Sequence, residues 1–335
     1  MSVVFNLTTG LFMIEIVCPQ AGALSNVEVA KVFERRRITH VFHDIDGTHS
    51  LIRDWVPVMA LVNGAVARYG MFPGKDAVEV AHAIAKHRGE EFEEAHRFAI
   101  ESAGLSALTQ MEWALRMARR LNNTSSELNE KIIAAIWAGE ERFEDAGESA
   151  EELALMNKQA TELFRAYEIL LLEMSRNENL AAARRDPVAW QVPGSVKFME
   201  FLHRNGVKNY FVTGAVVEYD ENGNACGTMA EEVTALGYPM GEGKLIERFC
   251  GSTWNEKLPK VEIMRKLCIT DNVNPENLLV IGDGRSEISA GVELGAINIS
   301  RLNDTAVRQK EIHRAIGTHL ILPDYLQVEK LFEVK

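Results

Sequence analysis

The sequence predicts a doubly wound α/β fold, in which helices cover both faces of a parallel sheet, with an all-helical cap domain inserted near its start. Three observations support this prediction. Short, wholly apolar strands alternate with helices from about residue 190 onward, as in parallel sheets buried on both faces. A single strand of the same kind occupies residues 38–43. Between them, residues 54–185 carry apolar residues at three- and four-residue steps, which is typical of amphipathic helices.

These changes of pattern divide the chain. We assign residues 1–37 to an N-terminal extension, residues 38–53 and 190–335 to the α/β catalytic core, and residues 54–189 to the helical cap. The extension ends in a segment, 27–37, that resembles a short helix. The cap holds about five to seven helices separated by glycine and asparagine. Open parallel sheets bind ligands at the carboxyl ends of their strands. We therefore expect a cap inserted after the first strand to lie over that site.

The core elements follow in order along the chain. The predicted strands are 207–214, 245–251, 276–284, 297–300 and 318–322, and the predicted helices are 194–206, 260–268, 285–296, 308–317 and a closing helix at 325–332.

Composition limits the class of protein. The formal net charge of −12 argues against nucleic acid or an anionic membrane as the main partner. No stretch reaches the roughly 20 uncharged apolar residues that a membrane span needs, and the N-terminus is a poor signal peptide. The four cysteines lie far apart without metal-binding spacing, which favours free thiols and a cytoplasmic protein.

Carboxylates gather where the predicted strands end. The first strand runs into Asp44-Ile45-Asp46-Gly47-Thr48, and a later strand runs into Gly282-Asp283 with Glu287 shortly after. Thr213 closes the strand between them, and Lys257 and Lys260 precede a helix. Because the carboxyl ends of parallel strands meet at one edge, we expect these groups to lie together.

Such a group of side chains suits phosphoryl transfer. Clustered carboxylates repel one another and call for a cation, and hard oxygen ligands without His or Cys favour Mg²⁺. Lysine and threonine add donors for an anion. One carboxylate can then attack phosphorus to form an aspartyl phosphate, and a second acid two residues later can move the protons.

The motifs resemble those of the haloacid dehalogenase superfamily of aspartate-nucleophile phosphotransferases over residues 38–53 and about 190–300. The resemblance implies that Asp44 is the nucleophile and Asp46 the general acid and base. It implies that Asp44, Asp283 and the backbone carbonyl of Asp46 ligate Mg²⁺. Glu287 would stand behind these ligands or act through water.

Further residues take roles from the same resemblance. Thr213 would hold a phosphoryl oxygen, and a lysine would neutralise Asp44 and the phosphate. Loop placement favours Lys257, whereas Lys260 matches another family spacing. The remaining candidates for phosphate or substrate contacts are Gly47, Thr48, Gly214, Arg53 and Lys260.

The resulting prediction is an enzyme, a Mg²⁺-dependent phosphatase that hydrolyses a small phosphorylated metabolite. An acid at position 46 favours an ester, since an alkoxide leaving group needs a proton. The alternatives are a phosphomutase, a phosphonatase with a cap lysine (Lys75, Lys86, Lys131 or Lys158), or a non-catalytic phosphometabolite-binding protein. His43 and His49 are expected at the surface or behind the site, and the tryptophans are expected to serve mostly in packing. Substrate identity and oligomeric state stay open.

Overall fold

The computed structural model describes residues 13–20, 22–121, 126–143, 147–254 and 258–335. Its centre is a seven-stranded sheet in the order β2-β11-β10-β9-β4-β5-β8. All neighbouring strands are parallel except β2, which runs antiparallel to β11 at one edge. The strands are β2 (Glu28–Val29), β4 (His40–His43), β5 (Lys208–Val216), β8 (Arg248–Ser252), β9 (Leu278–Gly282), β10 (Ile297–Arg301) and β11 (Leu320–Leu322).

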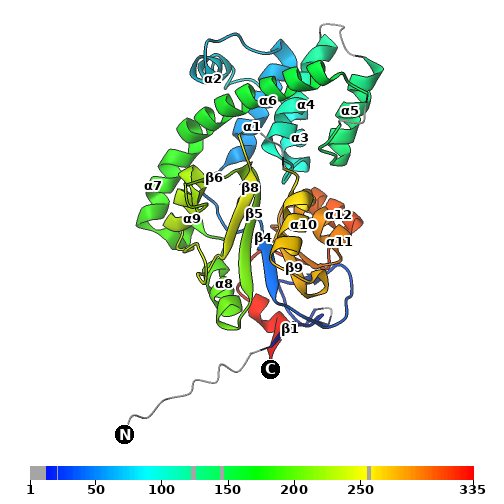
Figure 1. Cartoon of the computed structure of the whole chain (residues 1–335), viewed down its shortest axis with the longest axis vertical. Helices are drawn as coiled ribbons and strands as arrows, with labels where there is room; N and C mark the ends of the chain where they lie inside the picture. The colour runs from blue at the N-terminus through cyan, green and yellow to red at the C-terminus, as the bar shows by residue number, and fades with distance from the viewer. Residues whose placement is uncertain (1–12, 21, 122–125, 144–146, 255–257) are drawn as a thin grey trace.

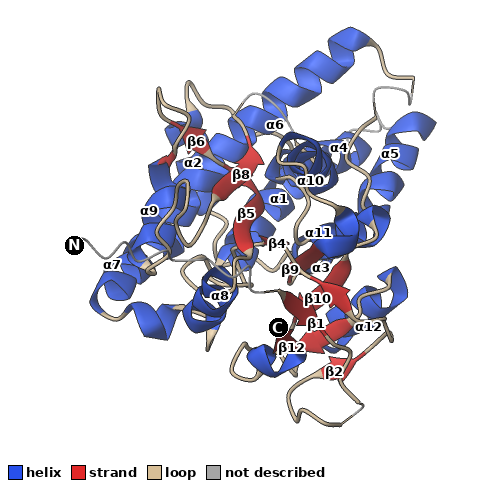
Figure 2. Ribbon diagram, turned by 60° about the horizontal axis from the view of Figure 1, so that its bottom comes forward, coloured by secondary structure: helices blue, strands red, loops and turns tan. Residues whose placement is uncertain are grey.

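Both faces of the sheet are covered, as its wholly apolar strands predicted. Val41 and Phe42 are neighbours in β4 but belong to two different core clusters, because successive side chains of a strand point to opposite faces. Helix α8 (Ser195–Arg204) covers the Val41 face. Helices α10 (Lys260–Thr270) and α11 (Arg285–Leu294) cover the Phe42 face (Figure 2). Helices α9 (Gly227–Ala235) and α12 (Val307–Ile316) complete the core.

A helical region is inserted between β4 and α8 and lies over one end of the sheet (Figure 1). It has a core of its own, in which the rings of Phe98 and Trp113 stack at 4.1 Å. The fold is therefore the predicted α/β core with a helical insertion. The inserted helices are α1 (Trp55–Tyr69), α2 (Ala77–Ala85), α3 (Glu93–Glu101), α4 (Ala107–Leu121), α5 (Glu127–Ala138), α6 (Ala150–Leu171), the π-helical turn η2 (Leu172–Arg176) and α7 (Asn177–Arg185). The domain limits drawn from the sequence stay a prediction.

Two terminal predictions are wrong. Residues 27–37 form β2 and β3 (Arg36–Arg37) instead of a helix, and the closing helix is one 3₁₀ turn, η5 (Val328–Leu331), followed by β12 (Phe332–Val334). Strand β1 (Ile14–Ile16) explains both, because it pairs with β3 on one side and β12 on the other. Residues 1–12 of the predicted extension lie outside the described residues.

The described part of the chain has no helix that is both long and apolar enough to cross a lipid bilayer. Its four cysteines are unpaired thiols, and each is partly buried.

Candidate active site

The loop after β4 holds the two aspartates of the first motif. Asp44 continues the sheet, since its backbone N–H donates to the carbonyl of Ile281 on β9, and its side chain is 8% exposed. The chain then turns tightly, with the N–H groups of Thr48, His49 and Ser50 all directed at the carbonyl of Ile45.

Gly47 is required in this turn for two reasons. Its φ of 74° lies in the left-handed region, which favours glycine. A Cβ at this position would also lie 2.1 Å from Oδ2 of Asp283. The absence of a side chain at residue 47 therefore lets the loop after β4 and the loop after β9 approach each other.

Lys260 is the lysine that contacts the predicted nucleophile. It is the first residue of α10, its side chain is 2% exposed, and its Nζ donates to Oδ1 of Asp44 at 2.6 Å and to Oε2 of Glu287 at 2.9 Å. Lys257, which loop placement favoured, lies outside the described residues. The two carboxylates raise the pKa of Lys260 despite its burial, so its charge is retained.

Asp283 and Glu287 follow β9 and are held differently. Oδ1 of Asp283 accepts a hydrogen bond from the Thr48 hydroxyl at 3.0 Å. Both oxygens of Glu287 are engaged, Oε1 by the Gly284 N–H at 2.5 Å and Oε2 by Lys260 and the Ser286 hydroxyl. Glu287 thus caps the start of α11 and positions the lysine.

Asp44, Asp283 and Glu287 form an acidic group suited to a divalent cation. One carboxylate oxygen from each lies within 4.8 Å of the other two. Burial and mutual repulsion raise the pKa of Asp283 well above its usual range, which indicates missing positive charge. Oδ1 of Asp46 is also buried without a hydrogen-bond partner. Hard oxygen donors of this kind, without nitrogen or sulfur, fit Mg²⁺.

The two aspartates of the first motif have different surroundings. Burial raises the pKa of Asp44 to about 6, although Lys260 opposes the rise. Burial raises the pKa of Asp46 to about 7, where Arg53 lowers it and Glu232, Asp44 and Glu168 raise it further. A carboxyl group that titrates near neutral pH can both donate and accept a proton.

Thr213 and Gly214 lie where β5 departs from regular pairing with β8. The buried Thr213 hydroxyl accepts from the N–H of Ala215 at 3.1 Å, which leaves its own proton for another acceptor. A Cβ on Gly214 would lie 2.9 Å from the carbonyl of Leu105 in the inserted region. The small residue therefore lets a cap loop contact the sheet.

Arg53 belongs to a buried ionic group rather than to solvent. Its Nε and Nη2 donate to Glu232 of α9 at 2.9–3.1 Å, and Nη1 lies 3.5 Å from Glu168 of α6. Glu232 also accepts from Arg176 at 2.7 Å. The side chains of Glu232, Arg53 and Arg176 are 1%, 3% and 7% exposed. One core carboxylate therefore binds an arginine just before the inserted helices and another between α6 and α7.

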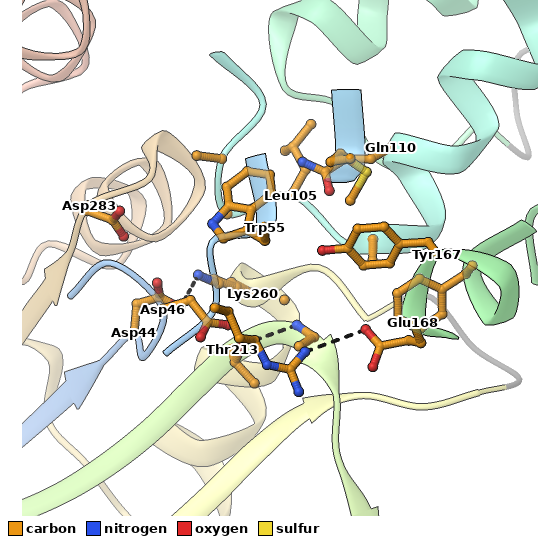
Figure 3. A pocket seen from close by; sticks show the side chains of 18 residues that line it. Asp44, Asp46, Trp55, Leu105, Gln110, Tyr167, Glu168, Thr213, Lys260 and Asp283 are labelled. Carbon is orange, nitrogen blue, oxygen red and sulfur yellow. Dashed lines mark hydrogen bonds and ion pairs between the residues drawn. The ribbon is translucent and has the colours of Figure 1, made fainter. Parts of the chain in front are cut away.

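These residues enclose a small cavity between sheet and cap (Figure 3). Its volume of about 70 Å³ is room for roughly five water molecules. The core supplies Asp44, Asp46, Thr213, Gly214, Lys260 and Asp283, and the inserted helices with their connecting loop supply Trp55, Met59, Leu105, Gln110, Phe164, Tyr167 and Glu168.

The cap side of this cavity was not predicted from the sequence. Trp55 was expected to serve in packing, and Tyr167 and Glu168 were not singled out. The one available signal was an acid inside the apolar run of the long helix α6. Periodicity marks such a position as unusual but does not show what it faces.

His43 and His49 lie behind the site and not at the surface. Both are fully buried, with Nδ1 of His43 2.9 Å from Nε2 of His49 and Nδ1 of His49 2.5 Å from the Ser195 hydroxyl. Burial lowers the pKa of His43 to about 3. The pair is therefore neutral and supports the loop after β4.

Comparison with known proteins gives distant structural matches. No family model matches the chain, and no curated protein does. Among solved structures, it matches a predicted phosphoglycolate phosphatase from Haemophilus somnus (14% identity, 88% of this chain and 97% of the other, TM-score 0.45). It also matches a predicted phosphatase from Clostridium acetobutylicum (10%, 88% and 97%, 0.47) and a β-phosphoglucomutase from Clostridium difficile (14%, 87% and 93%, 0.41). At these values the matches do not assign an activity.

Proposed function

We propose that this chain is a haloacid dehalogenase-type phosphatase that hydrolyses a small phosphomonoester through an aspartyl phosphate on Asp44. The supporting observation is that Asp44, Asp46, Thr213, Lys260 and Asp283 all line one small cavity. Asp44 and Asp46 follow β4, Asp283 follows β9, Thr213 lies in β5 where its pairing with β8 is interrupted, and Lys260 begins α10. If residues 44–48 were only a structural turn after a strand, Thr213, Lys260 and Asp283 would not need to lie beside them.

In the first step, a carboxylate oxygen of Asp44 attacks phosphorus. The bond from phosphorus to the ester oxygen breaks, and that oxygen keeps the electron pair and takes a proton from Asp46. Lys260 orients Asp44 through its 2.6 Å contact. Lys260 and the Thr213 hydroxyl hold phosphoryl oxygens, and their fixed positions stabilise the charge of the transition state.

In the second step, Asp46 removes a proton from a water molecule, and the resulting hydroxide attacks phosphorus. The bond to Asp44 breaks, which releases inorganic phosphate and restores the Asp44 carboxylate. The fit of the acidic group supports Mg²⁺ held by Asp44, Asp283 and the backbone carbonyl of Asp46. When bound, the ion supplies positive charge against the phosphate oxygens.

The cap lysines bear on the phosphonatase alternative. Such an enzyme needs a lysine at the substrate to form a Schiff base. Lys75, Lys86, Lys131 and Lys158 are all exposed, and none lines the cavity among the described residues. This favours the phosphatase.

The test is phosphate release from a panel of esters, with and without Mg²⁺. The panel contains para-nitrophenyl phosphate, sugar phosphates, nucleotides and phosphoglycolate. We expect Mg²⁺-dependent release by the wild type and a loss of about 10⁴-fold or more in Asp44→Asn, because the nucleophile is removed.

Asp304→Asn is the matched control, since the Asp304 side chain is 88% exposed, and it keeps wild-type activity. Wild-type turnover by Asp44→Asn would remove the nucleophile assignment. Release by neither protein from any ester would refute the phosphatase.

A further inference from the structure

The cap side of the cavity combines aromatic rings with a carboxylate. Trp55, Phe164 and Tyr167 line it together with the carboxylate of Glu168. Figure 3 shows Trp55 and Tyr167 projecting over the space above Asp46 and Lys260, with Glu168 beside Tyr167. The phosphate is bound by the core in the proposed reaction, so these cap residues face the leaving group.

Neither cation in the described lining of the cavity is free to bind a second anion besides the phosphate. Lys260 lies between Asp44 and Glu287. Arg53 is bound side-on by both oxygens of Glu232. A second phosphate or a carboxylate on the leaving group would meet paired cations.

The acid on this side is less well compensated. Among the described residues, the one ion pair of Glu168 is a long contact of 3.5 Å to Arg53, and burial raises the pKa of Glu168. A leaving group that carries positive charge would be attracted to this carboxylate.

The aromatic rings favour the same charge. Faces of Trp, Tyr and Phe attract ammonium groups, and the attraction is strongest where water is excluded. The rings of Phe164 and Tyr167 lie 5.8 Å apart in a stacked arrangement. The small volume of the cavity, about 70 Å³, favours a short leaving group.

We propose that the leaving group carries an ammonium, so that the substrate is the phosphomonoester of a small amino alcohol, with the ammonium held by Glu168 and the rings of Trp55, Phe164 and Tyr167. The inference rests on the proposed phosphatase function and names its substrate class.

The test compares two esters of similar size and opposite charge, O-phosphoethanolamine and phosphoglycolate, with para-nitrophenyl phosphate measured alongside. We expect wild-type kcat/KM to be about 100-fold higher for phosphoethanolamine than for phosphoglycolate. In Glu168→Gln this ratio falls about tenfold or more. Glu162→Gln, at a half-exposed position of the same helix, leaves the ratio unchanged.

The outcomes separate the two proposals. Preference for phosphoglycolate, or a ratio unaffected by Glu168→Gln, overturns the amino-alcohol inference while the phosphatase stands. The wild-type ratio alone decides the matter if Glu168→Gln does not fold. If none of the three esters is hydrolysed in Mg²⁺, the inference is overturned, and the wider ester panel decides separately whether the phosphatase stands.

Discussion

Replacing Lys260 with methionine tests the electrostatic arrangement of the site most directly. Methionine keeps an unbranched side chain but removes the charge. In the wild type, one ammonium lies among the carboxylates of Asp44, Asp283 and Glu287. The variant leaves these acids without their cation in a position that is 2% exposed.

The burial and pairing of Lys260 determine how much stability and activity the variant should lose. Removing one partner of a buried ion pair costs about 3–5 kcal/mol. Lys260 also lowers the pKa of Asp44, so without it the carboxyl titrates above its present value of about 6 and is more often protonated at pH 7. A protonated Asp44 cannot attack phosphorus, and a fixed positive charge is lost from the transition state. We expect activity to fall about 100-fold or more.

The assay combines urea unfolding at pH 7 in EDTA with phosphate release in Mg²⁺. Lys260→Met should lose about 3 kcal/mol of unfolding free energy in EDTA. Adding Mg²⁺ should restore part of this unfolding free energy, because the ion replaces the missing positive charge. Lys266→Met, at an exposed position of the same helix, is the control. The reasoning is refuted if Lys260→Met retains wild-type stability and activity, and more so if Lys257→Met loses activity instead.

Two other predictions concern stability and the cap. The pKa of His43 is about 3 in the fold and 6.5 in the unfolded chain, so the unfolded state binds the extra proton and stability falls as pH drops below 6.5. At pH 5 this difference lowers the free energy of unfolding by roughly 2 kcal/mol. In urea unfolding at pH 7 and pH 5, His43→Gln should therefore lose about that much less stability than the wild type. Equal losses in the two proteins would contradict a neutral, buried His43. In Gly104→Ala, a Cβ would lie 2.3 Å from the Ser286 hydroxyl at a φ of 87°. This Cβ should displace the loop after α3 from the core and lower activity at least tenfold. Gly70→Ala, with φ of 84° and open space around the added Cβ, should keep wild-type activity. Equal activities of the two variants would show that the loop contact is dispensable.

The sheet was predictable because its strands are short, apolar and separated by amphipathic helices. The same regularity predicted that Asp44 and Asp283 directly follow strands, as they do, whereas β5 continues past Thr213 to Val216. The terminal strands were not predictable in this way. Ile14 pairs with Val334, and a partner more than 300 residues away leaves no local periodicity in a three-residue strand.

Which side chains meet in the site depends on their orientation in the tertiary structure. Pro259 marks the start of a helix, but the sequence does not show that the first residue of that helix, Lys260, turns its side chain toward Asp44. The roles of Trp55 and Glu168 were equally hidden. Helical spacing shows that a residue is near the core-facing side of a helix, not whether it meets packed atoms or a cavity.

The shared carboxylate of Glu232 has a mechanical consequence. Arg53 lies where the chain leaves the sheet for the inserted helices, and Arg176 lies near their other end, between α6 and α7. Because both arginines bind the same carboxylate on α9, two distant parts of the insertion are held to one point of the core. We expect cap movement to be smallest at this point and larger at α5, which lies on the other side of the molecule from α9 in Figure 1.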